Sequence, residues 1–153
     1  MTPNLIQNLR NHEFLRGVPE PHILSLSPLA SEVTFEDNEV ILVEGERSSM
    51  FYLLLTGSVA VELRTPRYVI CVDALGPGQA FGWSALLDHQ DTLFQVRARE
   101  RTTVLRLDGA ALQSKCRAEP ELGIEILHRA LRLVAGRVKS TEIRFAQMCG
   151  IKV

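Results

Sequence analysis

The sequence has little that would place the chain outside the cell or within a membrane. Its three cysteines, Cys71, Cys116 and Cys149, are an odd number without CxxC spacing, which argues against a disulfide framework and favours reduced thiols in a cytoplasm. No apolar run approaches the ~18 residues that a membrane span needs. The polar N-terminus lacks the hydrophobic segment of a signal peptide. We therefore predict a cytoplasmic protein that does not insert into a membrane.

An excess of charge of one sign is also missing. The chain holds 17 Lys and Arg residues against 18 Asp and Glu residues, for a formal net charge of −1. Without a basic excess there is no electrostatic footprint for a polyanion, so we expect no direct binding of DNA. The chain also ends soon after its last predicted helix, and no recognition helix follows.

Catalytic and metal-binding motifs are absent as well. There is no GxSxG nucleophile motif, because the segment GWSAL lacks the second glycine. Metal-dependent jelly rolls need histidines that converge from neighbouring strands. The four histidines here are isolated from one another: His12, His22, His89 and His128. We predict a protein that is not an enzyme and has no metal site or obligate cofactor.

What is present divides the chain into zones. Residues 4–30 are interrupted by three prolines and predict short N-terminal helices. Residues 31–107 predict strands, with Gly and Pro between them. Within this zone, apolar and other residues alternate over 59–64, the period of a half-buried strand. The run over 68–75 is more continuously apolar, which predicts a strand covered on both faces, with Cys71 in the core.

The pattern becomes helical from Asp108 onward. Asp108 is placed to cap a first helix, and Pro120 is placed to open a second, longer one. Together the zones predict a single domain over 1–153 that is mainly β with flanking helices. Its expected core is a double-stranded β-helix, or jelly roll, over 31–107, followed by a C-terminal helix pair over 108–149.

The longer helix carries a heptad pattern with one polar position, Thr141. Apolar residues at spacings of three and four, kept over three heptads, are typical of a coiled-coil seam. Two interpretations remain open: a dimer interface, or a helix that packs on its own roll. The seam comprises Ile124, Leu127, Leu131, Val134, Val138, Phe145 and Met148.

Residues 81–98 resemble the phosphate-binding cassette of cyclic nucleotide-binding domains, in which Phe-Gly-Glu, a short helix, an Arg-Ser/Thr-Ala turn and a strand follow in order. Phe81, Gly82 and the run from Ala85 to Leu87 match it. The segment 14–63 resembles the first half of the same domain. The chain looks like small single-domain bacterial members of this family, and the resemblance implies a jelly-roll sensor that commonly dimerises through the C-terminal helix.

Two charged positions of the cassette are replaced. In the family an arginine binds the cyclic phosphate and a glutamate binds the ribose hydroxyl, whereas this chain has Thr92 and Trp83 there. Arg97 and Arg99 alternate with apolar residues and are expected to face outward. We therefore predict weak or absent binding of cyclic AMP and cyclic GMP. The candidate ligand-binding residues are Phe81, Gly82, Trp83, Ser84, Ala85, Thr92 and Leu93.

Individual roles in the cassette remain open. Trp83 either fills the vacated phosphate site or stacks on a flat ligand, and Ser84 either caps the short helix or offers its hydroxyl to a ligand. The whole chain admits two hypotheses. The first is a stand-alone regulatory sensor of a small effector, such as a cyclic nucleotide, that acts through a partner protein. The alternative is a dimeric interaction subunit that binds no ligand.

Overall fold

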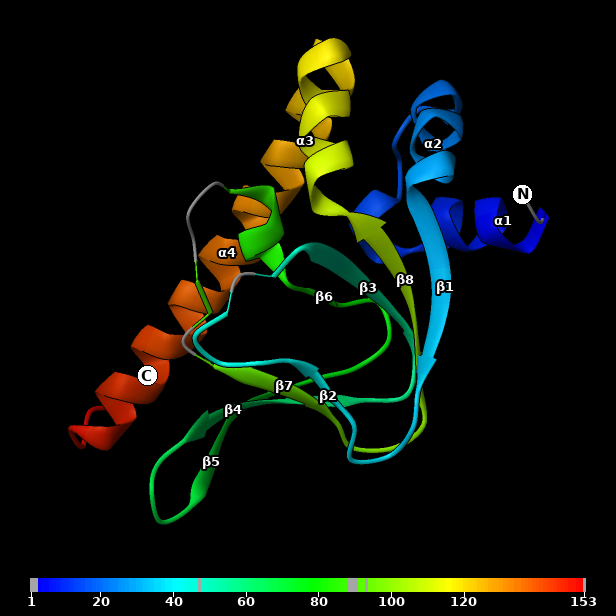
Figure 1. The fold of residues 1–153 in the computed structure, drawn as a ribbon. Coiled ribbons are helices and arrows are strands. Elements are labelled where there is room, and N and C mark those ends of the chain that lie inside the picture. Colours follow the sequence, from blue (N-terminus) through cyan, green and yellow to red (C-terminus); the bar gives the residue numbers. More distant parts are fainter. Residues whose placement is uncertain (1–2, 47, 88–90, 93, 153) are drawn as a thin grey trace.

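The computed structural model describes residues 3–46, 48–87, 91–92 and 94–152. Within them, antiparallel strands form two four-stranded sheets, in the orders β1-β8-β3-β6 and β2-β7-β4-β5. The two sheets face each other as the predicted roll (Figure 1). The strands are β1 (Ala30–Phe35), β2 (Val40–Leu42), β3 (Met50–Thr56), β4 (Val59–Arg64), β5 (Val69–Leu75), β6 (Ala80–Phe81), β7 (Gln95–Ala98) and β8 (Thr102–Asp108).

The helices gather beside the first sheet, and the longest, α4, runs from there toward the β4–β5 hairpin (Figure 1). Asp108 caps α3 as predicted, since the backbone N–H of Ala111 donates to its Oδ1 at 2.9 Å. Pro120 opens α4, also as predicted. The helical elements are α1 (Pro3–Asn11), η1 (Glu13–Leu15), α2 (Glu20–Leu26), η2 (Ser27–Leu29), η3 (Trp83–Leu86), α3 (Gly109–Ala118) and α4 (Pro120–Met148).

Strand β3 explains how the roll and the helices are joined. Its side chains alternate between two hydrophobic clusters because successive residues of a strand point to opposite faces. Phe51 and Leu53 belong to a helix-side core that also contains residues of α1, α2, α3 and α4. Tyr52 and Leu54 belong to the roll core, between the two sheets. Strand β3 is therefore covered on both faces.

The prediction of a doubly covered strand over 68–75 is wrong. Strand β5 lies at the edge of the second sheet, and its first three residues are exposed. Cys71 is among them, so its thiol is not in the core as expected. An apolar run alone does not distinguish a central strand from an edge strand, because the distinction depends on the order of strands in the sheet.

Helix α4 presents two different faces. Leu122, Ile126 and Ala130 are buried in the helix-side core. The seam residues point elsewhere: Leu127, Leu131, Val138 and Phe145 are 52%, 65%, 50% and 67% exposed, and Val134 is half-buried. The seam is therefore not the face with which α4 packs on its own domain.

Candidate ligand-binding site

The cassette begins where β6 ends. Gly82 adopts a left-handed conformation with φ of +80°, and a Cβ there would lie 2.7 Å from the carbonyl oxygen of Met50, so the turn requires glycine. Phe81, just before it, is buried and stacks on Tyr52 with ring centroids 4.8 Å apart. The structure thus brings Phe81 through Ala85 together in a single turn at the edge of the first sheet.

Trp83 is partly buried and packs against the helix-side core. This packing favours a structural role over that of a stacking platform. The indole lies on the helix side, however, and not in the roll core where a filled phosphate site was expected. Part of the indole surface is therefore used in packing against the helix-side core.

Ser84 does not cap η3 as predicted. The left-handed Gly82 already occupies the capping position and turns the chain into the helix, so Ser84 falls inside it. Its Oγ is buried and has no hydrogen-bond partner in the described part of the chain. A buried hydroxyl without a partner costs about 1–3 kcal/mol. The second interpretation, in which Ser84 offers its hydroxyl to a ligand, stays a prediction.

Thr92 is held by the loop between β2 and β3. Its Oγ1 lies 3.0 Å from the carbonyl oxygen of Val43 and 3.2 Å from that of Glu46, and donates its one proton to these two acceptors. The backbone N–H of Gly45 donates to the Thr92 carbonyl oxygen at 2.7 Å. Thr92 therefore holds its own segment to the loop between β2 and β3. Leu93, also among the predicted site residues, lies outside the described residues.

Arg97 on β7 and Arg99, just beyond the strand, face away from the roll core, as predicted. Val96 belongs to that core, whereas its neighbour Arg97 forms an ion pair with Glu62 on β4. Arg99 is exposed beyond the end of the strand. Neither supplies a cation to the interior of the roll.

Sequence reasoning missed Arg106, which does face the interior. It lies opposite Tyr52 in the register of β3 and β8, and directly opposed residues of antiparallel strands project to the same face. For Tyr52 that face is the roll core. The Nε of Arg106 is buried without a hydrogen-bond partner among the described residues. Val104 and Arg106 are two residues apart on one strand and therefore share a face, and this spacing is the signal that could have revealed Arg106.

The cassette is tied to the C-terminal helices by two contacts. Gln113 Nε2, on α3, donates to the carbonyl oxygen of Ala85 at 2.9 Å. Gly109, at the start of α3, leaves no room for a side chain, because a Cβ there would lie 2.6 Å from the same oxygen. A displacement of η3 would therefore move α3 as well.

Two kinds of feature are absent from the described residues. No group of three or more His, Cys, Asp or Glu side chains among them is arranged to hold a metal ion. No described helix combines the length and the apolar character that crossing a bilayer requires.

The family model of the cyclic nucleotide-binding domain matches residues 32–119. This range includes the cassette and all of the roll except the first two residues of β1. The chain belongs to the cyclic nucleotide-binding domain family.

Two curated relatives are described as potassium channels. One, from Rhodopseudomonas palustris, is 34% identical over 91 residues, or 60% of this chain. The other, from Arabidopsis thaliana, is 26% identical over 121 residues, or 74% of this chain. The chain spans only 22% and 14% of their respective lengths.

Solved structures of the family share the fold. A cyclic nucleotide-binding domain from Methylobacillus flagellatus superposes with a TM-score of 0.80 at 20% identity, covering 94% of this chain and 82% of that one. The regulatory subunit of a cAMP-independent protein kinase A from Trypanosoma brucei has a TM-score of 0.70 at 25% identity, covering 88% and 49%. A variant of the trypanosome subunit with three substitutions, one of them threonine to arginine, is bound to cAMP in its A site.

Proposed function

We propose that this chain is a non-catalytic regulatory domain that binds cyclic AMP and cyclic GMP weakly or not at all and acts through a protein partner. The observation that carries the proposal is Thr92. At the position where the family binds the cyclic phosphate with arginine, its hydroxyl is engaged by two carbonyl oxygens of the neighbouring loop. A phosphate anion there would find no charge-assisted hydrogen bond, the strongest contact in such a site.

Arg106 is the candidate for a replacement cation. It lies on β8, separated from β6 by β3, which at the usual strand spacing places the two backbones roughly 10 Å apart. It lies beside Tyr52 on the face of β8 that is turned to the roll core. Burial raises the pKa of Tyr52, and the charge of Arg106 partly offsets that rise. Any residual affinity for an anion inside the roll is therefore expected to depend on Arg106.

Action through a partner is supported by the relatives and by α4. A similar solved structure is a regulatory subunit of a kinase that is cAMP-independent, so a member of this fold can regulate another polypeptide without that nucleotide. The exposed seam of α4 offers a surface for association. We infer that its occupant is α4 of a second copy, because the apolar period of 3.5 residues suits pairing of like helices.

Thermal unfolding with and without nucleotide tests the ligand part of the proposal. A ligand at 100 times its dissociation constant stabilises a folded protein by about 2.7 kcal/mol. For a domain of this size that raises the midpoint by several degrees, at roughly 2–4 °C per kcal/mol. We expect no such shift with millimolar cyclic AMP or cyclic GMP. A clear shift would contradict the proposal, and its loss in Arg106→Met would assign the binding to that arginine.

A further inference from the structure

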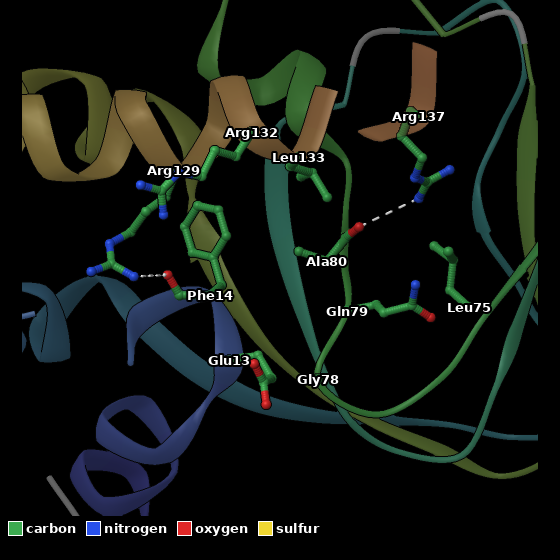
Figure 2. A pocket seen from close by; sticks show the side chains of 10 residues that line it. All are labelled: Glu13, Phe14, Leu75, Gly78, Gln79, Ala80, Arg129, Arg132, Leu133 and Arg137. Atoms are coloured by element: carbon green, nitrogen blue, oxygen red, sulfur yellow. Dashed lines mark hydrogen bonds between the residues drawn. The ribbon is translucent and has the colours of Figure 1, made fainter. Parts of the chain in front are cut away.

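A cavity of about 290 Å³ lies between α4, η1 and the turn that joins β5 to β6 (Figure 2). None of the described cassette residues (81–87, 91–92 and 94–98) lines it. It is therefore separate from the site that the family uses, and binding in this cavity does not require that the cassette bind a nucleotide.

The lining of this cavity is unbalanced in charge. Arg129, Arg132 and Arg137 line it from α4, against one carboxylate, Glu13. Glu13 is already paired with Arg16, with Oε1 3.0 Å from Nη1. The cavity therefore has a surplus of cationic groups on one wall.

Arg129 is occupied by the fold. Its Nη1 donates to the carbonyl oxygen of Phe14 at 3.0 Å, and its Nε donates to Glu125 at 3.2 Å. Arg132, one turn further along α4, is exposed and makes no hydrogen bond or ion pair with any described residue. Arg129 thus joins α4 to η1 at the cavity, and the guanidinium of Arg132 is available to a ligand.

Arg137 is held only loosely. Its hydrogen bonds within the described chain run to Asp73 at 3.4 Å and to the carbonyl oxygen of Ala80 at 3.5 Å, both near the limit of a hydrogen bond. A guanidinium has five N–H donors, so most of its capacity is unused. The side chain is only 25% exposed, and burial lowers the pKa of the guanidinium against the opposing pull of Asp73. An anion beside it would relieve this cost of burial.

The remaining wall is apolar. Figure 2 shows the ring of Phe14 and the side chain of Leu133 lining the space between the arginines, with Leu75 on the far side. Sites for small molecules are mostly apolar and carry a few placed polar groups. We propose that this cavity binds a small organic anion, whose carboxylate or phosphate group pairs with Arg137, whose apolar body lies against Phe14 and Leu133, and whose negative charge Arg132 attracts from the opposite side.

Such a ligand would act on α4 directly. Asp73 lies on β5 and contacts both Arg137 and Arg144 of α4, at 3.4 and 3.6 Å. An anion on the unused N–H groups of Arg137 places a second negative charge near Asp73, and the repulsion between the two anions weakens the Asp73–Arg137 pair. Occupancy of the cavity therefore changes how α4 is fastened to the β4–β5 hairpin.

The test is a titration of the full chain with phenyl phosphate, benzoate and benzyl alcohol, followed by ¹H–¹⁵N NMR. We expect saturable shifts at residues 13–14, 78–80 and 129–137 with one or both anions and none with the neutral alcohol. The two anions distinguish a phosphate site from a carboxylate site. Arg137→Gln should weaken binding about tenfold or more, because it removes a shielded charge-assisted contact.

Arg132→Gln keeps the test decisive if Arg137→Gln does not fold, because Arg132 is exposed and makes no hydrogen bond or ion pair with any described residue. It should weaken binding roughly threefold, as expected for an exposed ion pair. Arg101→Gln removes the same charge at a distant exposed turn and should change nothing. The proposal is overturned by equal binding of the alcohol, by equal weakening in Arg101→Gln, by shifts confined to residues 82–92, or by no saturable binding.

Discussion

Arg97 on β7 holds the carboxylate of Glu62 on β4 with two hydrogen bonds, 3.0 Å from Nε to Oε1 and 2.6 Å from Nη2 to Oε2. Gln95 Nε2 donates a third to Oε1 at 2.8 Å. Glu62 is only 3% exposed, and the hydrogen bonds from Arg97 keep its pKa below the ordinary value despite burial. These three side chains fasten β4 to β7 on the outer face of the second sheet.

Replacing Arg97 by methionine leaves the Glu62 charge buried without its cation. Removal of one partner of a buried pair typically costs about 3–5 kcal/mol, and the partial exposure of Arg97, 31% of its side chain, reduces the expected loss to roughly 2–3 kcal/mol. Urea denaturation at pH 7 measures it. Arg101→Met, at an exposed turn, is the control and should cost little; an equal loss in both variants would contradict this account of the cluster.

The same pair predicts how stability depends on acid pH. Because the folded pKa of Glu62 is lowered, its contribution is complete above the unfolded value of about 4.5 and is lost as pH falls through the folded pKa. In Glu62→Gln this part of the acid dependence should disappear. Denaturation midpoints measured between about pH 5 and pH 2 test it, and an unchanged slope in the variant would show that other carboxylates cause the loss.

His12 predicts a second pH dependence, nearer neutrality. Its Nδ1 accepts from the backbone N–H of Phe14 at 3.1 Å, so its Nε2 carries the proton donated to the Leu54 carbonyl oxygen at 3.0 Å. Burial lowers its pKa. The unfolded chain therefore binds a proton first, and stability should fall as pH drops below about 6.5 toward the folded pKa. His12→Gln should flatten this slope, whereas His128→Gln, at an exposed site, should leave it unchanged.

The seam of α4 predicts the oligomeric state. We expect light scattering to give twice the 17.1-kDa mass of the chain. Leu131→Glu places a charge at a seam position that is 65% exposed in the single chain, so it should yield monomers without lowering their thermal midpoint. Ser140→Glu, an exposed residue of the same helix off the seam, should remain dimeric. A monomeric wild-type chain would overturn the dimer.

Much of the fold could be predicted because local signals agreed with it. The cap at Asp108 and the start at Pro120 depend on a few neighbouring residues, and the heptad seam depends on spacing along a single helix. Sheet order is different in kind. The exposure of Cys71 and the double burial of Phe51 and Tyr52 follow from which strands are central, and that is set by pairing between distant segments.

The candidate site was predictable in its backbone and less so in its side chains. The need for glycine at position 82 followed from the resemblance, and the clash with Met50 explains it. Ser84 was expected to cap η3, but the cap is Gly82, two residues earlier. Arg106 was overlooked because it lies outside the cassette in the sequence. It comes opposite Tyr52 only because β8 pairs with β3 in the folded roll.

The most direct test of the central claim is a calorimetric titration of cyclic AMP into the wild type, Thr92→Arg and the pair Trp83→Glu with Thr92→Arg. Trp83→Glu with Thr92→Gln serves as the matched control without the new cation, and thermal unfolding confirms that each variant folds. The account predicts negligible binding by the wild type. The pair should bind at least roughly a hundredfold more tightly than its control, because charged hydrogen bonds contribute about 1.5–3 kcal/mol each. Tight binding by the wild type, or no gain in a folded pair, would contradict it.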